Sequence, residues 1–114
     1  MTQVTLCVAS AEDLARRARA ALRGEKQGAF ISFASPDLLW RVLTRKRWDI
    51  LRAMTGQGAL AMREIARRVA RDVKGVHSDV HALIDAGVIR RDEMGGFVFP
   101  YDSVHVDFTL TAAA

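Results

Sequence analysis

The sequence predicts a mostly helical α+β domain, and three observations support that fold class. The chain has 114 residues, of which half are hydrophobic and 26% are charged, as in an ordinary globular domain. Apolar residues recur at helical spacing through most of the segment 11–86. Short β-prone stretches flank this segment, at 3–9 and again between residues 88 and 110. Since a chain of this length can bury a hydrophobic core without disulfides or metals, we expect a single domain.

The N-terminal part of the chain carries signals for the start and the end of a helix. Ser10 precedes Asp13 by three residues, which is typical of an N-cap followed by an acidic first turn. Leucines and alanines then recur at helical spacing until Gly24, a residue type that favours helix termination. The predicted N-terminal extension, residues 1–34, therefore holds a strand over 3–9, a helix over 11–23 and a strand over 29–33.

Four further helices are predicted between residues 35 and 87. Ser35 and Pro36 favour a helix start, because serine caps well and proline suits the first helical position. Thr44 is the expected N-cap of the next helix, after a basic break in the apolar pattern. Asp72 is the expected N-cap of the last helix, and Gly87 ends it. The expected helical patterns cover 36–43, 48–55, 62–69 and 73–86.

The C-terminal third predicts a β-hairpin and one further strand. Gly95-Gly96 forms a turn signal between the β-prone runs 88–91 and 97–99. Hydrophobic residues alternate strictly over 104–110, which predicts a half-buried strand. Its apolar face would hold Val104, Val106, Phe108 and Leu110. Because this strand and the strand at 3–9 each leave an open edge, we expect them to pair with each other or across a two-fold axis.

The order of elements between residues 35 and 100 predicts a winged helix-turn-helix. The helices 62–69 and 73–86 are joined by a three-residue turn and followed by the hairpin, which would be the wing. Small and apolar residues stand where these two helices would meet. The predicted organisation is an extension at 1–34, a winged helix-turn-helix at 35–100 and a C-terminal strand and tail at 101–114.

Basic residues concentrate in two segments of this central region. The chain carries 17 Lys and Arg against 13 Asp and Glu, and 14 of the basic residues are Arg. The segment 41–52 has five bases and one acid, and the segment 63–78 has five bases and two acids. Two basic clusters around one helical region indicate nucleic-acid binding better than the overall charge does. Arginine also suits phosphate and guanine contacts better than lysine.

The candidate DNA-binding residues fall on the second helix of the motif and beside it. A recognition helix buries one face and keeps the other polar, so that it can lie in the major groove. The residues expected to face base edges are Lys74, Gly75, His77 and Ser78. Those expected to contact phosphate or to lie on the wing are Arg45, Arg47, Arg63, Arg67, Arg68, Arg71, Arg90 and Arg91. Asp79 and Asp85 on the same helix are expected to be a solvated or cap-side pair.

Four segments of the sequence carry a family resemblance. They are 43–48, 63–68, 71–80 and 99–102. The most specific piece runs from Arg71 to Val80 and reads RDVKGVHSDV. These segments resemble small winged-helix transcriptional regulators of bacteria and archaea, which are MarR-like in their DNA-binding part and are sometimes described as antitoxin-like. The chain departs from that pattern at Ala70, where the turn is expected to hold glycine, and at Gly75, where a polar residue is common.

The sequence argues against several other function classes. The single cysteine, Cys7, excludes an intramolecular disulfide and a cysteine-based zinc site. The three histidines lack neighbouring ligands and no catalytic motif is present, so we expect no metal, no cofactor and no enzyme activity. No apolar run is long enough for a membrane span and the N-terminus does not resemble a signal peptide. We therefore expect a cytoplasmic protein without membrane association.

Three functional hypotheses remain open from the sequence. The first is a sequence-specific, double-stranded DNA-binding transcriptional regulator, a homodimeric repressor that reads a palindromic operator with helix 73–86 in the major groove. The second is an antitoxin-like interaction module that binds a small toxin protein and autoregulates its operon. The third is an adaptor in a phage or another assembly that uses the winged helix for protein contacts. The neighbouring genes and the affinity for DNA would discriminate among them.

Overall fold

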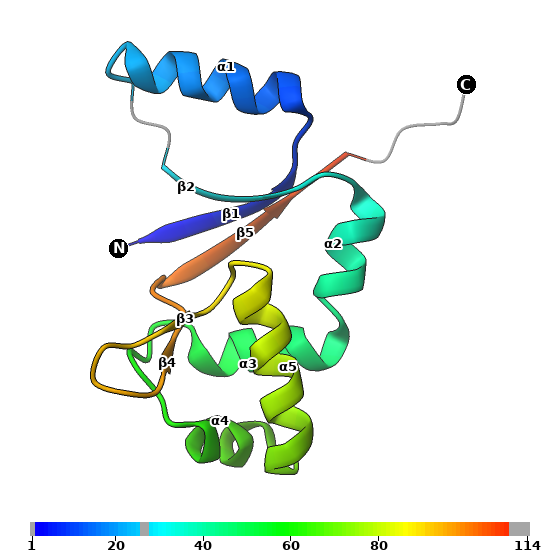
Figure 1. Ribbon diagram of the computed structural model, residues 1–114, viewed down its shortest axis with the longest axis vertical. Coiled ribbons are helices and arrows are strands. Elements are labelled where there is room, and N and C mark those ends of the chain that lie inside the picture. The colour runs from blue at the N-terminus through cyan, green and yellow to red at the C-terminus, as the bar shows by residue number, and fades with distance from the viewer. Residues whose placement is uncertain (1, 26–27, 110–114) are drawn as a thin grey trace.

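The computed structural model describes residues 2–25 and 28–109, and this part of the chain forms an α+β fold with two small sheets (Figure 1). The three-stranded sheet lies between α1 and the helices α3, α4 and α5, while α2 lies at one side (Figure 1). The elements in chain order are β1 (Gln3–Val8), α1 (Ala11–Leu22), β2 (Ala29–Phe33), α2 (Pro36–Val42), α3 (Arg45–Met54), α4 (Met62–Val69), α5 (Val73–Asp85), β3 (Arg90–Arg91), β4 (Phe97–Val98) and β5 (Ser103–Asp107).

Local capping signals account for most of the helix starts. The Ser10 hydroxyl accepts the Asp13 backbone N–H and the Asp13 carboxylate accepts the Ser10 backbone N–H, which completes a capping box for α1. Ser35 is the N-cap of α2 and Thr44 is the N-cap of α3, and each caps its helix with its side-chain hydroxyl. Since Thr44 caps directly, α3 begins at Arg45 rather than at residue 48 as the apolar pattern suggested. Asp72 occupies the N-cap position of α5 as predicted, although its side chain makes no capping hydrogen bond.

The larger sheet is parallel and has the strand order β2-β1-β5. In its register Leu6 of β1 stands between Ile31 of β2 and Val106 of β5. The predicted pairing of the N-terminal and C-terminal strands is therefore confirmed, and it occurs within one chain. As a result β1 is the central strand, and the open edges of this sheet belong to β2 and β5.

The last strand is shorter and less buried than its alternation predicts. β5 covers Ser103–Asp107 instead of 104–110, and Leu110 lies outside the described residues. Val104 is half-buried, but the Val106 side chain is 37% exposed. The predicted apolar face is confirmed at Val104 and Phe108, which are half-buried, and Val106 on the same face borders a cavity between the sheet and the helices.

The hairpin strands are also shorter than expected. β3 begins at Arg90, not at residue 88. The backbone N–H groups of Val88 and Ile89 both donate to the Leu83 carbonyl, at 2.9 and 3.3 Å, so these residues complete the end of α5. Both side chains are buried at this helix end. The hairpin is tied to the chain before α4 by the β-bridge between Leu60 and Phe97.

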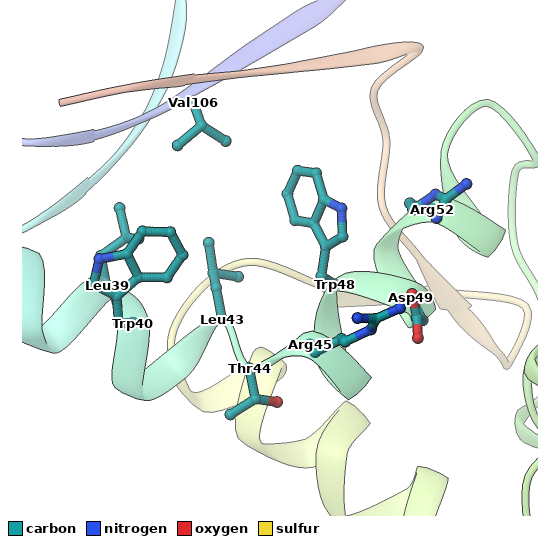
Figure 2. A pocket seen from close by; sticks show the side chains of 9 residues that line it. All are labelled: Leu39, Trp40, Leu43, Thr44, Arg45, Trp48, Asp49, Arg52 and Val106. Atoms are coloured by element: carbon teal, nitrogen blue, oxygen red, sulfur yellow. The ribbon is translucent and has the colours of Figure 1, made fainter.

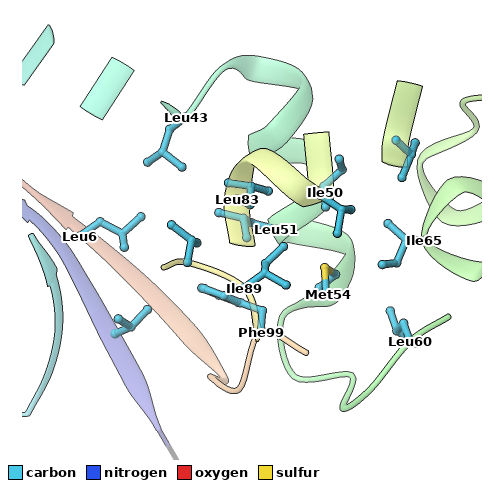
Figure 3. Close-up of a cluster of buried hydrophobic side chains, with 14 of the residues drawn as sticks. Leu6, Leu43, Ile50, Leu51, Met54, Leu60, Ile65, Leu83, Ile89 and Phe99 are labelled. Atoms are coloured by element: carbon cyan, nitrogen blue, oxygen red, sulfur yellow. The ribbon is translucent and has the colours of Figure 1, made fainter. Parts of the chain in front are cut away.

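One hydrophobic cluster joins the sheet to the helices (Figure 3). Leu6 enters it from β1, while Ile65 enters it from α4 on the far side. Phe99 and Ile89 lie between these two ends and are almost completely buried. The helices α3, α4 and α5 are thus held on the same core as the sheet, which fixes the position of α5 relative to the rest of the described chain.

The turn between α4 and α5 contains an unusual backbone conformation. Ala70 has φ 53° and is the only non-glycine residue with positive φ in the described chain. The next backbone N–H, that of Arg71, donates to the Ala66 carbonyl at 3.0 Å. A left-handed residue with this bond is a common way to end a helix, and glycine usually fills the position. The expectation that this position suits glycine is therefore confirmed by the backbone.

The longest described helix, α5, has 13 residues, and none of the described helices combines the length and apolarity that a membrane crossing requires.

Candidate nucleic-acid interface

The helix α5 divides into a buried face and an exposed face. Val76, Val80 and Leu83 are completely buried in the core. On the opposite side Lys74, His77 and Ser78 are exposed, and Gly75 is half-buried beside them. Three of the four residues predicted to face base edges therefore share one solvent-facing strip near the N-terminal half of the helix.

Gly75 has a different structural role from the one expected. A Cβ atom at this position would lie 3.2 Å from the Nη2 atom of Arg71, which is closer than an ordinary contact. The glycine therefore makes room for the Arg71 guanidinium as it passes along the helix toward Asp79. This intramolecular contact gives a reason for Gly75 that does not require a ligand.

Asp79 joins α5 to two arginines from other segments. Its carboxylate accepts a hydrogen bond from Arg47 Nε at 3.0 Å and one from Arg71 Nη2 at 2.8 Å. The side chains of this ion-pair cluster, Arg47, Asp79 and Arg71, are only 22%, 16% and 23% exposed. Arg47 also donates to the Val42 carbonyl at 3.1 Å. The expectation of a solvated Asp79 is therefore wrong.

The charge state of Asp79 follows from this cluster. Burial by itself raises the pKa of the Asp79 carboxyl, because it penalises the charged form. The hydrogen bonds from Arg47 and Arg71, together with their positive charges, outweigh burial and hold the pKa below the usual 3.8. Asp79 is thus ionised at neutral pH and links α3, the α4–α5 turn and α5.

A second carboxylate engages two of the predicted phosphate contacts on α4. Glu64 forms ion pairs with Arg67 and with Arg68, the latter at 3.0 Å. Arg68 also donates to the Gln57 side-chain oxygen at 2.9 Å. The hydrogen bonds from Arg67 and Arg68 lower the pKa of the Glu64 carboxyl to about 2. Half of the eight predicted phosphate-binding arginines, namely Arg47, Arg67, Arg68 and Arg71, are therefore already paired with carboxylates.

The other four predicted phosphate contacts have no carboxylate partner within residues 2–25 and 28–109. They are Arg45, Arg63, Arg90 and Arg91, and all four are exposed. Lys74 on α5 is likewise exposed and makes no ion pair with a described residue. Arg91 lies over the Phe97 ring, with its guanidinium carbon 5.7 Å from the ring centre. These cations sit at the start of α3, the start of α4, the start of α5 and on the hairpin.

Two histidines connect α5 to the hairpin, and sequence reasoning did not anticipate the contact. The rings of His77 and His81 have centroids 4.2 Å apart, and the rings of His81 and Phe97 form a T-shaped pair with centroids 6.3 Å apart. The spacing of four residues on one helix face was a sequence signal for the histidine pair. No local pattern in the sequence indicated that Phe97 of β4 would contact this histidine pair.

The chemistry of this surface is defined by its exposed cations. It offers cations and hydrogen-bond donors on an exposed helix face, beside a hairpin that also carries cations. Among the described residues no group of three His, Cys, Asp or Glu side chains is placed to hold a metal ion. Such a surface is complementary to a polyanion.

Comparison with known proteins gives one match. The model of the family described as HVO_A0114 matches residues 42–106, which include α3, α4, α5 and the hairpin. No curated protein matches the chain, and no solved structure matches it.

Proposed function

The chain belongs to the HVO_A0114 family, and we propose that it is a sequence-specific, double-stranded DNA-binding transcriptional regulator. In this proposal α4, the turn at 70–72 and α5 act as a helix-turn-helix, with the β3–β4 hairpin as its wing. The recognition helix α5 lies in the major groove. Lys74, His77 and Ser78 face base edges, while Gly75 leaves room for the Arg71 guanidinium instead of contacting a base.

The observation that carries the proposal is the exposed strip of α5. Lys74, His77 and Ser78 all project to solvent, while the opposite face of the helix is fixed in the core. Asp79 is the one carboxylate between the two ends of α5, and the two arginines of its ion-pair cluster already neutralise it. The strip therefore combines a rigid position, hydrogen-bond donors and a positive charge, which are the properties that a major-groove reader needs.

The free and the paired arginines have different roles in this proposal. Arg45, Arg63, Arg90 and Arg91 contact phosphate, because no described carboxylate competes for them. Arg67 and Arg68 keep their bonds to Glu64 and add only long-range positive charge. Arg47 and Arg71 hold α5 in place through Asp79 rather than touching DNA.

The proposal includes a homodimer that represses transcription at a palindromic operator. A two-fold protein places its two recognition helices in successive major grooves, with half-sites about 10 base pairs apart. The open edges of the three-stranded sheet, at β2 and β5, are the surfaces available for a second copy. Light scattering at about 50 μM should give twice the monomer mass, and a stable monomer would contradict the dimer.

Selection of bound duplexes from a random double-stranded DNA pool tests the proposed function directly. We expect a palindrome whose half-sites are about one helical turn apart. A parallel selection with the Lys74→Ala variant should lose sequence preference, while Arg19→Ala on the exposed face of α1 should retain it. If the duplexes recovered with the wild-type protein share no common sequence, that result would contradict sequence-specific binding.

A second candidate function is supported by α1. Leu14 and Leu22 on this helix are 47% and 88% exposed, and only Ala20 among its residues is buried. An amphipathic helix with exposed leucines suits the antitoxin-like alternative, in which α1 contacts a small toxin protein. Co-expression with the product of an adjacent small reading frame tests it. The Leu14→Asp/Leu22→Asp variant should lose that complex and keep DNA binding, and retention of the complex would contradict a role for α1.

A further inference from the structure

A cavity of about 620 Å³ lies between α2, α3 and β5, apart from the proposed DNA-binding strip of α5 (Figure 2). Its volume falls within the range of small-molecule sites, which is about 300–1,000 Å³. The Trp48 indole points up from α3 toward Val106 of β5, and Leu43 projects between the two helices (Figure 2). The lining residues are Leu39, Trp40, Leu43, Thr44, Arg45, Trp48, Asp49, Arg52 and Val106.

The wall of this cavity is mainly apolar. Leu39 and Leu43 contribute aliphatic surface from α2, and Val106 contributes it from the sheet. Trp40 and Trp48 add two indole rings, and Trp40 is further held by an edge-to-face contact with Phe108, at 5.6 Å between centroids. Aromatic side chains with fixed orientation favour a flat or aliphatic body between them.

The cavity also has a charged part. Arg45 and Arg52 of α3 line it together with Asp49, which stands between them in the sequence. None of these three side chains makes a hydrogen bond or an ion pair with a residue in the described part of the chain. These three side chains together carry a net charge of one positive unit, and the Arg52 guanidinium, which is not among the proposed phosphate contacts, is available for an acidic group.

We propose that this cavity binds a small organic monoanion, an apolar or aromatic body that ends in one carboxylate. The body occupies the space between Trp40, Trp48 and Val106, and the carboxylate reaches the guanidinium of Arg52. This site is independent of the proposed DNA-binding function, because it needs neither α5 nor the hairpin.

The two tryptophans provide the readout. The chain contains two Trp residues, and both line this cavity, so intrinsic tryptophan emission reports directly on its contents. The probe is 4-phenylbutyrate, compared with 4-phenylbutan-1-ol and 4-phenylbutylamine, which share its body but are neutral and cationic. Excitation at 295 nm avoids absorption by the probes. We expect the anion to bind about tenfold more tightly than the alcohol, because a charge-assisted hydrogen bond is added, and the amine to bind most weakly.

Two variants and one control distinguish this site from nonspecific binding. Arg52→Gln should remove most of the preference for the anion, and Val106→Phe should weaken all three probes by filling the cavity. Arg19→Gln on α1 removes a positive charge elsewhere on the exposed surface and should change nothing. Arg52 is not among the proposed DNA contacts, so the result does not depend on DNA binding.

Two outcomes would overturn the proposal. Equal binding of the anion and the alcohol, unchanged by Arg52→Gln, would show that no acidic group is recognised. In the second outcome, the tryptophan emission varies with protein concentration but does not change when any of the three probes is added. That result would show that a second copy of the chain covers the cavity instead.

Discussion

At the scale of single residues, Asp79 links α5 to two other segments of the chain. It accepts hydrogen bonds from Arg47, 32 residues away in sequence, and from Arg71, eight residues away. A pattern of charges along one helix cannot reveal partners at these separations, so the sequence indicated only a solvated carboxylate. The same holds for Gly75, whose neighbour Arg71 is in contact only because the α4–α5 turn brings it there.

Replacing Asp79 tests this cluster. Asp79→Asn leaves Arg47 and Arg71 without their carboxylate, so we expect a loss of about 1–3 kcal/mol in the free energy of unfolding at pH 7. Because the pKa of Asp79 is lowered in the folded state, its contribution is complete above pH 4 and is lost as the pH falls through that lowered value. The difference between wild type and variant, measured by urea unfolding, should therefore shrink at pH 3.

Asp85→Asn on the exposed end of α5 is the matched control for that experiment. It removes one carboxylate from the same helix and should change the unfolding free energy by less than about 0.5 kcal/mol. An equal loss from both variants, or a loss for Asp79→Asn that does not change with pH, would contradict the role of the Asp79 ion pairs.

Gly75→Ala tests the space reserved for Arg71. Alanine in a helix interior is favoured over glycine by about 1 kcal/mol, so the substitution alone should stabilise the protein. Its Cβ would lie 3.2 Å from Arg71 Nη2, and the displaced guanidinium offsets part of that gain. Thermal unfolding should therefore show a larger stabilisation in the Arg71→Gln background than in the wild type. Equal effects in both backgrounds would mean that Gly75 does not accommodate Arg71.

At the scale of elements, signals between neighbouring residues predicted the helix starts well. Features that depend on contacts between distant segments were not predicted. Ser10, Ser35 and Thr44 cap their helices as their sequence positions indicate, because a cap needs only the next three residues. Asp72 occupies the N-cap position of α5, although its side chain makes no capping hydrogen bond. The strands at 88–91 and 104–110 were predicted too long. The local alternation of hydrophobic and polar residues does not show where α5 ends or that a cavity borders Val106.

The turn between α4 and α5 allows a stability prediction at this scale. Ala70 has φ 53°, a conformation that disfavours alanine by about 1–2 kcal/mol relative to glycine. Ala70→Gly should therefore raise the free energy of unfolding by about 0.5–1 kcal/mol, although glycine also gives the unfolded chain more freedom. Chemical denaturation measures the change, with Ala15→Gly, at an exposed position inside α1, as the control that should lose about 1 kcal/mol. A loss of stability for Ala70→Gly would contradict the strained turn.

At the scale of the whole molecule, the sheet and the helices share one core. The sequence suggested that the two terminal strands pair, and the structure shows them side by side and parallel within one chain. The strands at 3–9 and 104–110 therefore partner each other, and the open edges of the sheet are those of β2 and β5. The cavity between α2, α3 and β5 appears only when these distant segments meet, so no sequence pattern could have located it.

The distribution of charge also becomes clear only at this scale. The two basic segments of the sequence contain both free and neutralised arginines, a distinction set by Asp79 and Glu64. Of the predicted phosphate contacts, Arg45, Arg63, Arg90 and Arg91 are left without a carboxylate in the described chain. The positive charge that is not paired with a described carboxylate is therefore smaller than the sequence count suggests and lies around α5.

The most direct test of the central claim is a fluorescence anisotropy titration of Lys74→Ala and wild type on a selected duplex and on an unrelated duplex, at several salt concentrations. For the wild type, the logarithm of the affinity should fall linearly with the logarithm of the salt concentration, because phosphate contacts release counterions. Lys74→Ala should weaken binding to the selected duplex by about ten- to a hundredfold and change binding to the unrelated duplex only slightly. Equal weakening on both duplexes, or a wild-type affinity that does not depend on salt, would contradict an α5 that reads DNA.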